Sequence, residues 1–207
     1  DISIKEDLIE EVGRIYGVNN IKGKLPNILP RMGSYDKVSR QIRNKMIDLG
    51  LNETLTYVLT AESDAKMFTT SDSDLVKLLD PLSEDRNTLR QSLAVSLYRI
   101  YEYNKARNNK DVSIFEMGKV FEKVGEEYKE TMKLGALMTG EYYLGLNKKQ
   151  VNFYMIKGVA EEILDYLGYN GRYSFVQDEN KLPKEMHPGQ SAVIFCTVFY
   201  LYAFFNI

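Results

Sequence analysis

The chain has 207 residues, with 27 lysines and arginines, 29 aspartates and glutamates, and 44% hydrophobic residues. This composition excludes a disordered or low-complexity chain, and the length suits one large domain or one domain with part of another. The single cysteine excludes an internal disulfide framework and a cysteine-based zinc site, and the single histidine excludes a histidine-rich metal centre. The net charge of -2 argues against nucleic-acid binding by bulk electrostatics.

Neither end of the chain predicts a passage through a membrane. Residues 1–7 lack the basic and apolar regions of a signal peptide, and they begin without an initiating methionine, which indicates an excised fragment. The apolar run AVIFCTVFYLYAFF at residues 192–205 is shorter than the roughly 20 residues of a membrane-spanning helix. Its β-branched and aromatic content favours a buried strand or strand pair. We therefore expect a cytoplasmic protein, with a membrane anchor as the lesser alternative.

The first predicted helix covers residues 4–16, where Leu8, Val12, Ile15 and Tyr16 follow one apolar stripe and Gly17 ends the pattern. Two prolines and two glycines between residues 23 and 33 indicate a linker. We expect residues 1–26 to be the end of one domain, residues 27–34 to be the linker, and residues 35–207 to form a second domain.

The second domain is predicted to mix helices and strands without a repeat. A charged turn around residues 125–127 indicates an antiparallel hairpin between its two longest strands. The irregular order of elements favours an α+β fold with an antiparallel sheet over a doubly wound fold. Helices are expected at residues 34–49, 62–68, for about 15 residues after Ser92, and at 152–167; strands are expected at residues 52–59, 76–79, 111–122, 133–139, 173–177 and 190–195.

Acidic side chains near the N-terminus are the best candidate site. Asp7, Glu10 and Glu11 share a face of the first predicted helix, and Asp1 stands a short extended reach ahead of them. Carboxylate oxygens on a common face are the ligands that Mg²⁺ requires. The alternative is structural, because the helix dipole favours acidic residues in the first turn and Glu10 can pair with Arg14. Spacing alone favours this second interpretation.

Familiar catalytic motifs are absent from the sequence. A nucleophilic mechanism would have to combine Cys196 with His187, but Cys196 lies in an apolar run, where thiols are usually inert, and His187 precedes a Pro-Gly turn. The charged residues 84–86 and 89–90 approach a predicted helix start. They could bind a phosphate or a partner, although salt bridging at the helix start is the favoured interpretation.

A modest basic and aromatic group follows the helix that begins after Ser92. Lys105, Arg107 and Lys110 follow Tyr101 and Tyr103, a combination that could contact RNA. A solvated helix end is the favoured explanation of the same residues.

Six segments carry motifs in a fixed order along the chain. They read DISIKEDLIEEVGRIYG at residues 1–17, DPLSEDR and LRQSL within residues 80–93, YNKAR at 103–107, IFEMGKVF at 114–121, FYMIKG at 153–158, and HPGQSA at 187–192. Together they resemble the β subunit of bacterial phenylalanine–tRNA ligase. The first segment is similar to the end of the family's B5 domain, and the others are similar to its catalytic-like core.

The resemblance implies an antiparallel class II aminoacyl-tRNA synthetase-like core flanked by helices. It implies a scaffold and interface module, because in this family the α subunit binds ATP and phenylalanine and the β module packs against it in an (αβ)₂ heterotetramer. It also implies a Mg²⁺ site shared with the α subunit, whose four acidic positions fall on Asp1, Asp7, Glu10 and Glu11. The tRNA(Phe) is expected to bind mainly through other regions, since the family's editing and tRNA-binding domains lie outside this segment.

The sequence departs from the family at two places. Asn152 stands where the family usually has aspartate, and the resemblance fades after Ala192. Two alternatives therefore stay open beside the scaffold module. One is a self-sufficient class II-like ATP-dependent enzyme, which needs an arginine pair and acidic groups around ATP. The other is an RNA-binding module that uses Lys105, Arg107 and Lys110.

Overall fold

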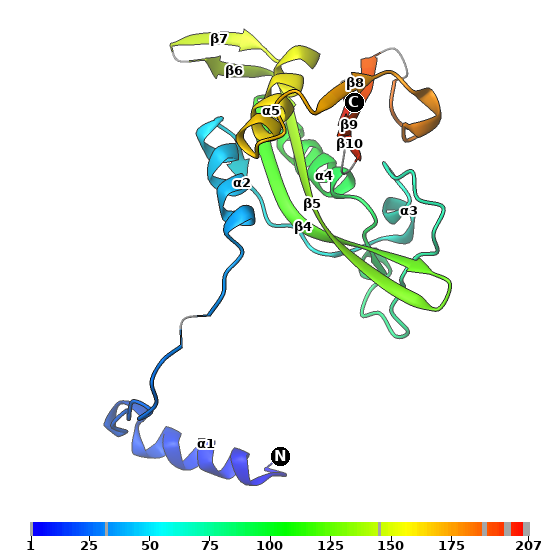
Figure 1. The fold of residues 1–207 in the computed structure, drawn as a ribbon. Helices are drawn as coiled ribbons and strands as arrows, with labels where there is room; N and C mark the ends of the chain where they lie inside the picture. Colours follow the sequence, from blue (N-terminus) through cyan, green and yellow to red (C-terminus); the bar gives the residue numbers. More distant parts are fainter. Residues whose placement is uncertain (1, 32, 145, 188–189, 197–199, 205–207) are drawn as a thin grey trace. The chain divides into compact units, whose positions relative to one another are not determined.

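The computed structural model describes residues 2–31, 33–144, 146–187, 190–196 and 200–204 (Figure 1). Contacts divide the chain into two compact units, residues 1–35 and 36–207, and each is described here by itself. The first unit contains helix α1 (Lys5–Tyr16) and the 3-10 turn η1 (Val18–Asn20). The predicted helix is confirmed. Within this unit the described residues leave its apolar stripe open: Leu8 is 55% exposed and Ile15 is 80% exposed.

The three longest helices of the second unit begin where the sequence places polar caps. The side chains of Asp36, Ser92 and Asn152 each accept a hydrogen bond from a backbone N–H in the first turn, which satisfies donors that a helix start leaves unpaired. The predicted cap at Ser92 is thereby confirmed. The helical elements are α2 (Lys37–Asp48), α3 (Glu62–Ala65), η2 (Glu84–Arg86), α4 (Leu93–Lys105), α5 (Phe153–Tyr166) and η3 (Glu179–Lys181).

The strands of the second unit form four separate sheets within the described residues. Most neighbours are antiparallel, as expected, but β1 (Asn52–Glu53) runs parallel to β4 (Val112–Val124), so this sheet is mixed. In order across each sheet, the strands are β1, β4 and β5 (Glu127–Thr139); β10 (Tyr200–Phe204), β9 (Ser191–Cys196) and β8 (Tyr173–Val176); β2 (Leu59–Thr60) and β3 (Thr88–Leu89); and β6 (Glu141–Leu144) and β7 (Asn147–Gln150).

The β4–β5 hairpin is the longest element of the fold. Its strands pair in register from Val112 opposite Thr139 to Val124 opposite Glu127, so only two residues form the turn. Gly125 in this turn has a φ of +63°, a conformation that tight hairpin turns require and that glycine adopts without strain. The predicted hairpin is confirmed, and both strands extend to the turn.

Helices α4 and α5 hold the sheets together (Figure 1). Leu97 of α4 packs on Val112, Ile114 and Leu137 of the hairpin, whereas Val95 packs on the other side, against Phe68 and Met186. Helix α5 is likewise buried on two sides. Its Ile163 joins a cluster with Met46 and Phe115, and its Leu164 packs on Ile194 of β9. The core therefore lies between helices and sheets, as in an α+β fold.

Several predicted elements differ in the structure. Residues 52–59 do not form one strand but two short ones, because β1 pairs with β4 and β2 pairs with β3. Residues 76–79 contribute only an isolated bridge at Lys77, and α3 ends at Ala65, before Phe68 takes a φ of +54°. The apolar tail forms the antiparallel pair β9–β10, which confirms a strand pair there.

Candidate functional site

The acidic face of α1 begins with a carboxylate that caps the helix. Oδ2 of Asp7 accepts hydrogen bonds from the backbone N–H groups of Ser3 and Ile4 at 3.0 and 3.2 Å. These backbone donors favour the ionised form and lower the pKa of Asp7 below its ordinary value. Asp7 therefore has a structural role in the first turn, as the dipole interpretation predicts.

The remaining acidic residues of α1 are arranged differently from the predicted pair. Arg14 donates to Oε2 of Glu11 at 2.5 Å, so its salt-bridge partner is Glu11 and the expected Glu10–Arg14 pair is wrong. Asp1 lies outside the described residues, so the structure describes only three of the four predicted Mg²⁺ ligands. Within the described part of the chain, no group of three or more acidic, histidine or cysteine side chains could hold a metal ion.

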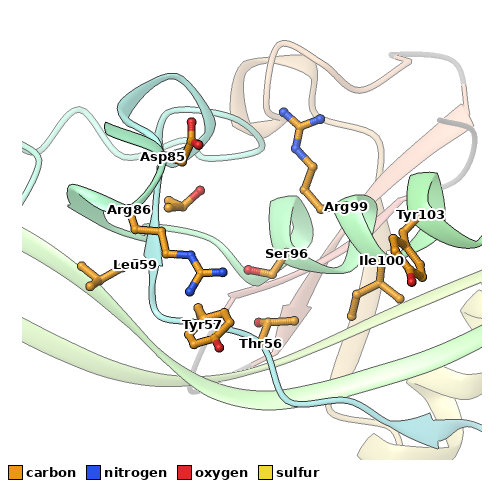
Figure 2. Close-up of a pocket in the computed structure, with 10 residues that line it drawn as sticks. Thr56, Tyr57, Leu59, Asp85, Arg86, Ser96, Arg99, Ile100 and Tyr103 are labelled. Atoms are coloured by element: carbon orange, nitrogen blue, oxygen red, sulfur yellow. The ribbon is translucent and has the colours of Figure 1, made fainter. Parts of the chain in front are cut away.

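The second unit contains an open pocket of about 480 Å³ beside α4. One wall is the segment that leads into β2, with Thr56 and Tyr57; the opposite wall is α4, with Ser96, Arg99 and Tyr103. Figure 2 shows these side chains from both walls around one hollow. The α4 side chains come from positions 96, 99, 100 and 103, a spacing that puts them on one face of the helix.

Beneath this pocket lies a buried ion pair. A guanidinium nitrogen of Arg90 is 2.8 Å from Oε1 of Glu116, and both side chains are only 2% exposed. Arg90 also donates to the hydroxyl groups of Thr56 and Ser96 at 2.6 and 3.3 Å, and Thr56 donates to Glu116 at 2.6 Å. Two pocket-lining hydroxyls are therefore held by the ion pair.

The favoured interpretation of the helix-start charges is wrong for Arg90. Its partner is not a neighbouring acid in the same segment but Glu116 on β4, and its Nε also donates to the Lys119 carbonyl at 3.1 Å. A buried charge needs such partners, because desolvation makes an unpaired one very costly. The sequence signal for a buried ion pair is Glu116, an acidic residue that stands between Phe115 and Met117 on a strand expected to be buried.

Two arginines line the pocket and have their own partners. The guanidinium carbon of Arg86 lies 3.8 Å from the ring centroid of Tyr57. Arg99 forms salt bridges with Asp64 and Glu102, both at 2.6 Å, and its hydrogen bonds to these carboxylates raise the pKa of the guanidinium. The charge of Arg99 is thus largely balanced by the two acidic neighbours.

The other sequence candidates lie on separate elements. Cys196 is the half-buried last residue of β9, opposite Tyr173 of β8, and His187 is an exposed loop residue. In the basic group, the guanidinium of Arg107 stacks at 3.4 Å from the Tyr103 centroid, and the Lys105 ammonium lies 5.3 Å from the Tyr101 centroid. This group is continuous with the pocket, since Tyr103 belongs to both.

No helix within the described ranges combines the length and the apolar content needed to cross a bilayer.

Comparison with known proteins identifies the family to which the chain is similar. The family model of the phenylalanyl tRNA synthetase beta chain CLM domain matches residues 21–198. The phenylalanine–tRNA ligase beta subunit of Bacillus subtilis (strain 168) is 38% identical over 202 residues, and that of Staphylococcus haemolyticus (strain JCSC1435) is 36% identical over 204 residues.

Each of these two alignments covers 94% of this chain but only 25% of the relative, so the chain spans about a quarter of their length. Among solved structures, a pyrrolysyl tRNA synthetase from Desulfitobacterium hafniense aligns with a TM-score of 0.56 and 18% identity, covering 80% of this chain and 55% of the other. At this identity the likeness shows the fold alone. The expected class II synthetase-like α+β fold is confirmed.

Proposed function

Because the chain belongs to the family of the phenylalanyl tRNA synthetase beta chain CLM domain, we propose that it is a module of the beta subunit of a phenylalanine–tRNA ligase. That enzyme attaches phenylalanine to tRNA(Phe) with ATP. The single observation that carries this proposal is the family match over residues 21–198, which spans most of the second unit. In this proposal, residues 1–26 end the B5 domain, residues 27–34 are the linker, and residues 35–207 form the catalytic-like core.

The role proposed for the module is that of a scaffold for the catalytic α subunit. A self-sufficient enzyme would need arginines that converge on the phosphates of ATP. Beneath the pocket Arg90 is buried against Glu116; in the pocket Arg99 is balanced by Asp64 and Glu102, and Arg86 is stacked on Tyr57. Because Arg90 and Arg99 are neutralised by these acids, the described arginines do not converge on one phosphate site, which supports a module that positions a catalytic partner and leaves ATP and phenylalanine to it.

The proposed partner is the α subunit in an (αβ)₂ heterotetramer of the cytoplasm. The relatives' name as a beta subunit supports an α partner. The apolar stripe of α1, which its own unit leaves exposed, also supports a partner that covers it, because isolated helices of about 12 residues are marginal in water.

The proposal extends to a Mg²⁺ site formed by Asp1, Asp7, Glu10 and Glu11 together with the α subunit. The donor chemistry fits, because Mg²⁺ takes carboxylate oxygens and keeps several waters. Asp7 uses Oδ2 for its backbone bonds and Glu11 uses Oε2 for Arg14, so among the described contacts a second oxygen stays available on each. Since the described residues alone form no metal-holding group, the site depends on Asp1 and on the partner.

Capture by a tagged α subunit tests the scaffold role. The chain is expected to co-purify with its α subunit and to support charging of tRNA with phenylalanine in the assembled enzyme. Glu10→Ala and Glu11→Ala should weaken the Mg²⁺ dependence of assembly, whereas Glu126→Ala, at the β4–β5 turn, is the matched acidic control. If the chain is not captured, the scaffold role is wrong; if both α1 variants assemble and charge tRNA normally, the metal site is wrong.

A further inference from the structure

The pocket beside α4 is flanked by two tyrosine–arginine stacks of the same kind. Arg86 lies over Tyr57 at 3.8 Å, and Arg107 lies over Tyr103 at 3.4 Å, measured from the guanidinium carbon to the ring centroid. Both tyrosines line the pocket, one from each wall, and Figure 2 shows them with Ser96 and Thr56 between. The repetition places two flat, cationic and aromatic surfaces around one hollow.

Exposure of the stacks distinguishes them from core packing. Tyr57 is 69% exposed and Tyr103 is 60% exposed, and both arginines are exposed. A cation–π stack at such an exposed site contributes little to stability. What sets these two tyrosines apart from other exposed ones is that both line the same pocket with an arginine stacked on the ring, and accessible aromatic rings are the platforms on which nucleic-acid bases stack.

Exposed positive charge extends from one side of the pocket, beyond the end of α4. Arg99 is balanced by Asp64 and Glu102, so it adds little to the local field. Beyond Tyr103, the helix end and the following loop carry Lys105, Arg107 and Lys110, all exposed. A positively charged track that leads from an aromatic pocket suits a chain of phosphates with unpaired bases better than a single small anion.

The floor of the pocket is held rigidly. Thr56 and Ser96 are bound by the buried Arg90, and Arg90 is bound by Glu116 on the sheet. The volume of about 480 Å³ lies within the range of ligand sites in proteins. A preformed pocket avoids part of the ordering cost of binding, which leaves more of the stacking energy for affinity.

We propose that this pocket binds a single-stranded RNA segment, with bases stacked on Tyr57 and Tyr103 and phosphates held by Arg86, Arg107 and Lys105. A duplex cannot present its bases to these rings, because base pairing and stacking bury their faces. The inference goes beyond the proposed scaffold function, which assigns this module no RNA contact and places tRNA binding mainly elsewhere.

Fluorescence anisotropy with a labelled ten-nucleotide single-stranded RNA tests the site in the full chain. Each of Tyr57→Ala and Tyr103→Ala is expected to weaken binding about tenfold or more, since base–aromatic stacking is worth ~1–3 kcal/mol per base. Tyr57→Phe keeps the ring and should retain most of the affinity. Tyr128→Ala, on an equally exposed tyrosine of β5, should have no effect. Thermal melting of each variant verifies that the fold is kept.

Three results would overturn the proposal. The first is equal affinity of the parent chain, Tyr57→Ala and Tyr103→Ala. The second is equal binding of single-stranded and duplex RNA, which would show attraction by charge alone. The third is a loss of α-subunit capture by Tyr57→Ala or Tyr103→Ala while RNA binding by that variant is unchanged, which would make the pocket a protein interface. Because capture by the α subunit is measured separately, a failure of the RNA site is distinguishable from a failure of the scaffold role.

Discussion

Helices α1 and α4 have nearly the same length, 12 and 13 residues, and both carry an apolar stripe at helical spacing. Helix α4 buries Leu93, Val95 and Leu97, whereas within the described residues α1 buries no side chain. The difference teaches that spacing predicts a helix and the face that needs cover, but not where the cover comes from. For α4 the cover lies within the second unit; the described residues of the first unit supply none for α1, and we infer that it comes from the α subunit.

The largest expected effect concerns the ion pair that precedes α4. Arg90→Met leaves Glu116 charged and unpaired in a buried place, so the free energy of unfolding should fall by about 3–5 kcal/mol. Urea denaturation measures this. The matched control is Arg99→Met, which breaks partly exposed salt bridges and should cost at most about 1 kcal/mol. Similar losses in both variants would mean that burial does not separate the two arginines.

A direct test of the comparison truncates one leucine in each helix. Leu97→Ala should destabilise the second unit by about 2–5 kcal/mol, because it removes a buried side chain and leaves a cavity. Leu8→Ala in α1 should change the free energy of unfolding of the isolated chain by at most about 0.5 kcal/mol. Chemical denaturation of both variants decides the point, and a large loss from Leu8→Ala would show that α1 is covered within the chain.

Two glycines differ in the space around them, so replacing each by alanine should have opposite effects on stability. A Cβ on Gly118 would lie 2.3 Å from Arg90 Nη2 and 3.3 Å from Leu93, so Gly118→Ala should destabilise by about 1–3 kcal/mol. A Cβ on Gly158 in α5 meets no atom within 4 Å, and alanine is the better helix former, so Gly158→Ala should stabilise by up to about 1 kcal/mol. Melting curves that move in the same direction for both would contradict this assignment.

The smallest effect concerns the start of α1. The pKa of Asp7 is lowered by the backbone N–H groups of Ser3 and Ile4, so its contribution to helix stability is present above the ordinary carboxyl pKa near 4 and is lost as the pH falls through the lowered value. The amide resonances of Ser3 and Ile4 should shift over this acidic range. In Asp7→Asn the shift should vanish, and a persistent shift would assign the titration to another group.

The sequence predicted local elements well and distant partners poorly. Ser92, Gly17 and the turn at Gly125 mark element ends because caps and tight turns depend on residues close in the chain. The sequence does not pair Arg90 with Glu116, since their contact joins a loop to a strand and no local pattern encodes it. The parallel pairing of β1 with β4 escaped for the same reason.

The β6–β7 hairpin was missed for a different reason. Its strands are short and mostly polar, from Glu141 to Gln150, so they lack the apolar alternation that predicts a half-buried strand. It is tied to the fold by Tyr142, whose hydroxyl donates to the Leu49 carbonyl at the end of α2.

In the acidic residues of α1, the general arrangement was predictable and the detail was not. Their shared face was predictable, but the choice of Glu11 over Glu10 as partner of Arg14 depends on side-chain geometry.

Phenylalanine-dependent exchange between ATP and pyrophosphate tests the central claim most directly. The assay is run on the chain alone, on the α subunit alone and on their mixture. A scaffold module predicts no exchange by the chain alone and restored exchange when both are mixed. Exchange by the chain alone, in proportion to its concentration, would contradict the account and make the chain an enzyme in its own right.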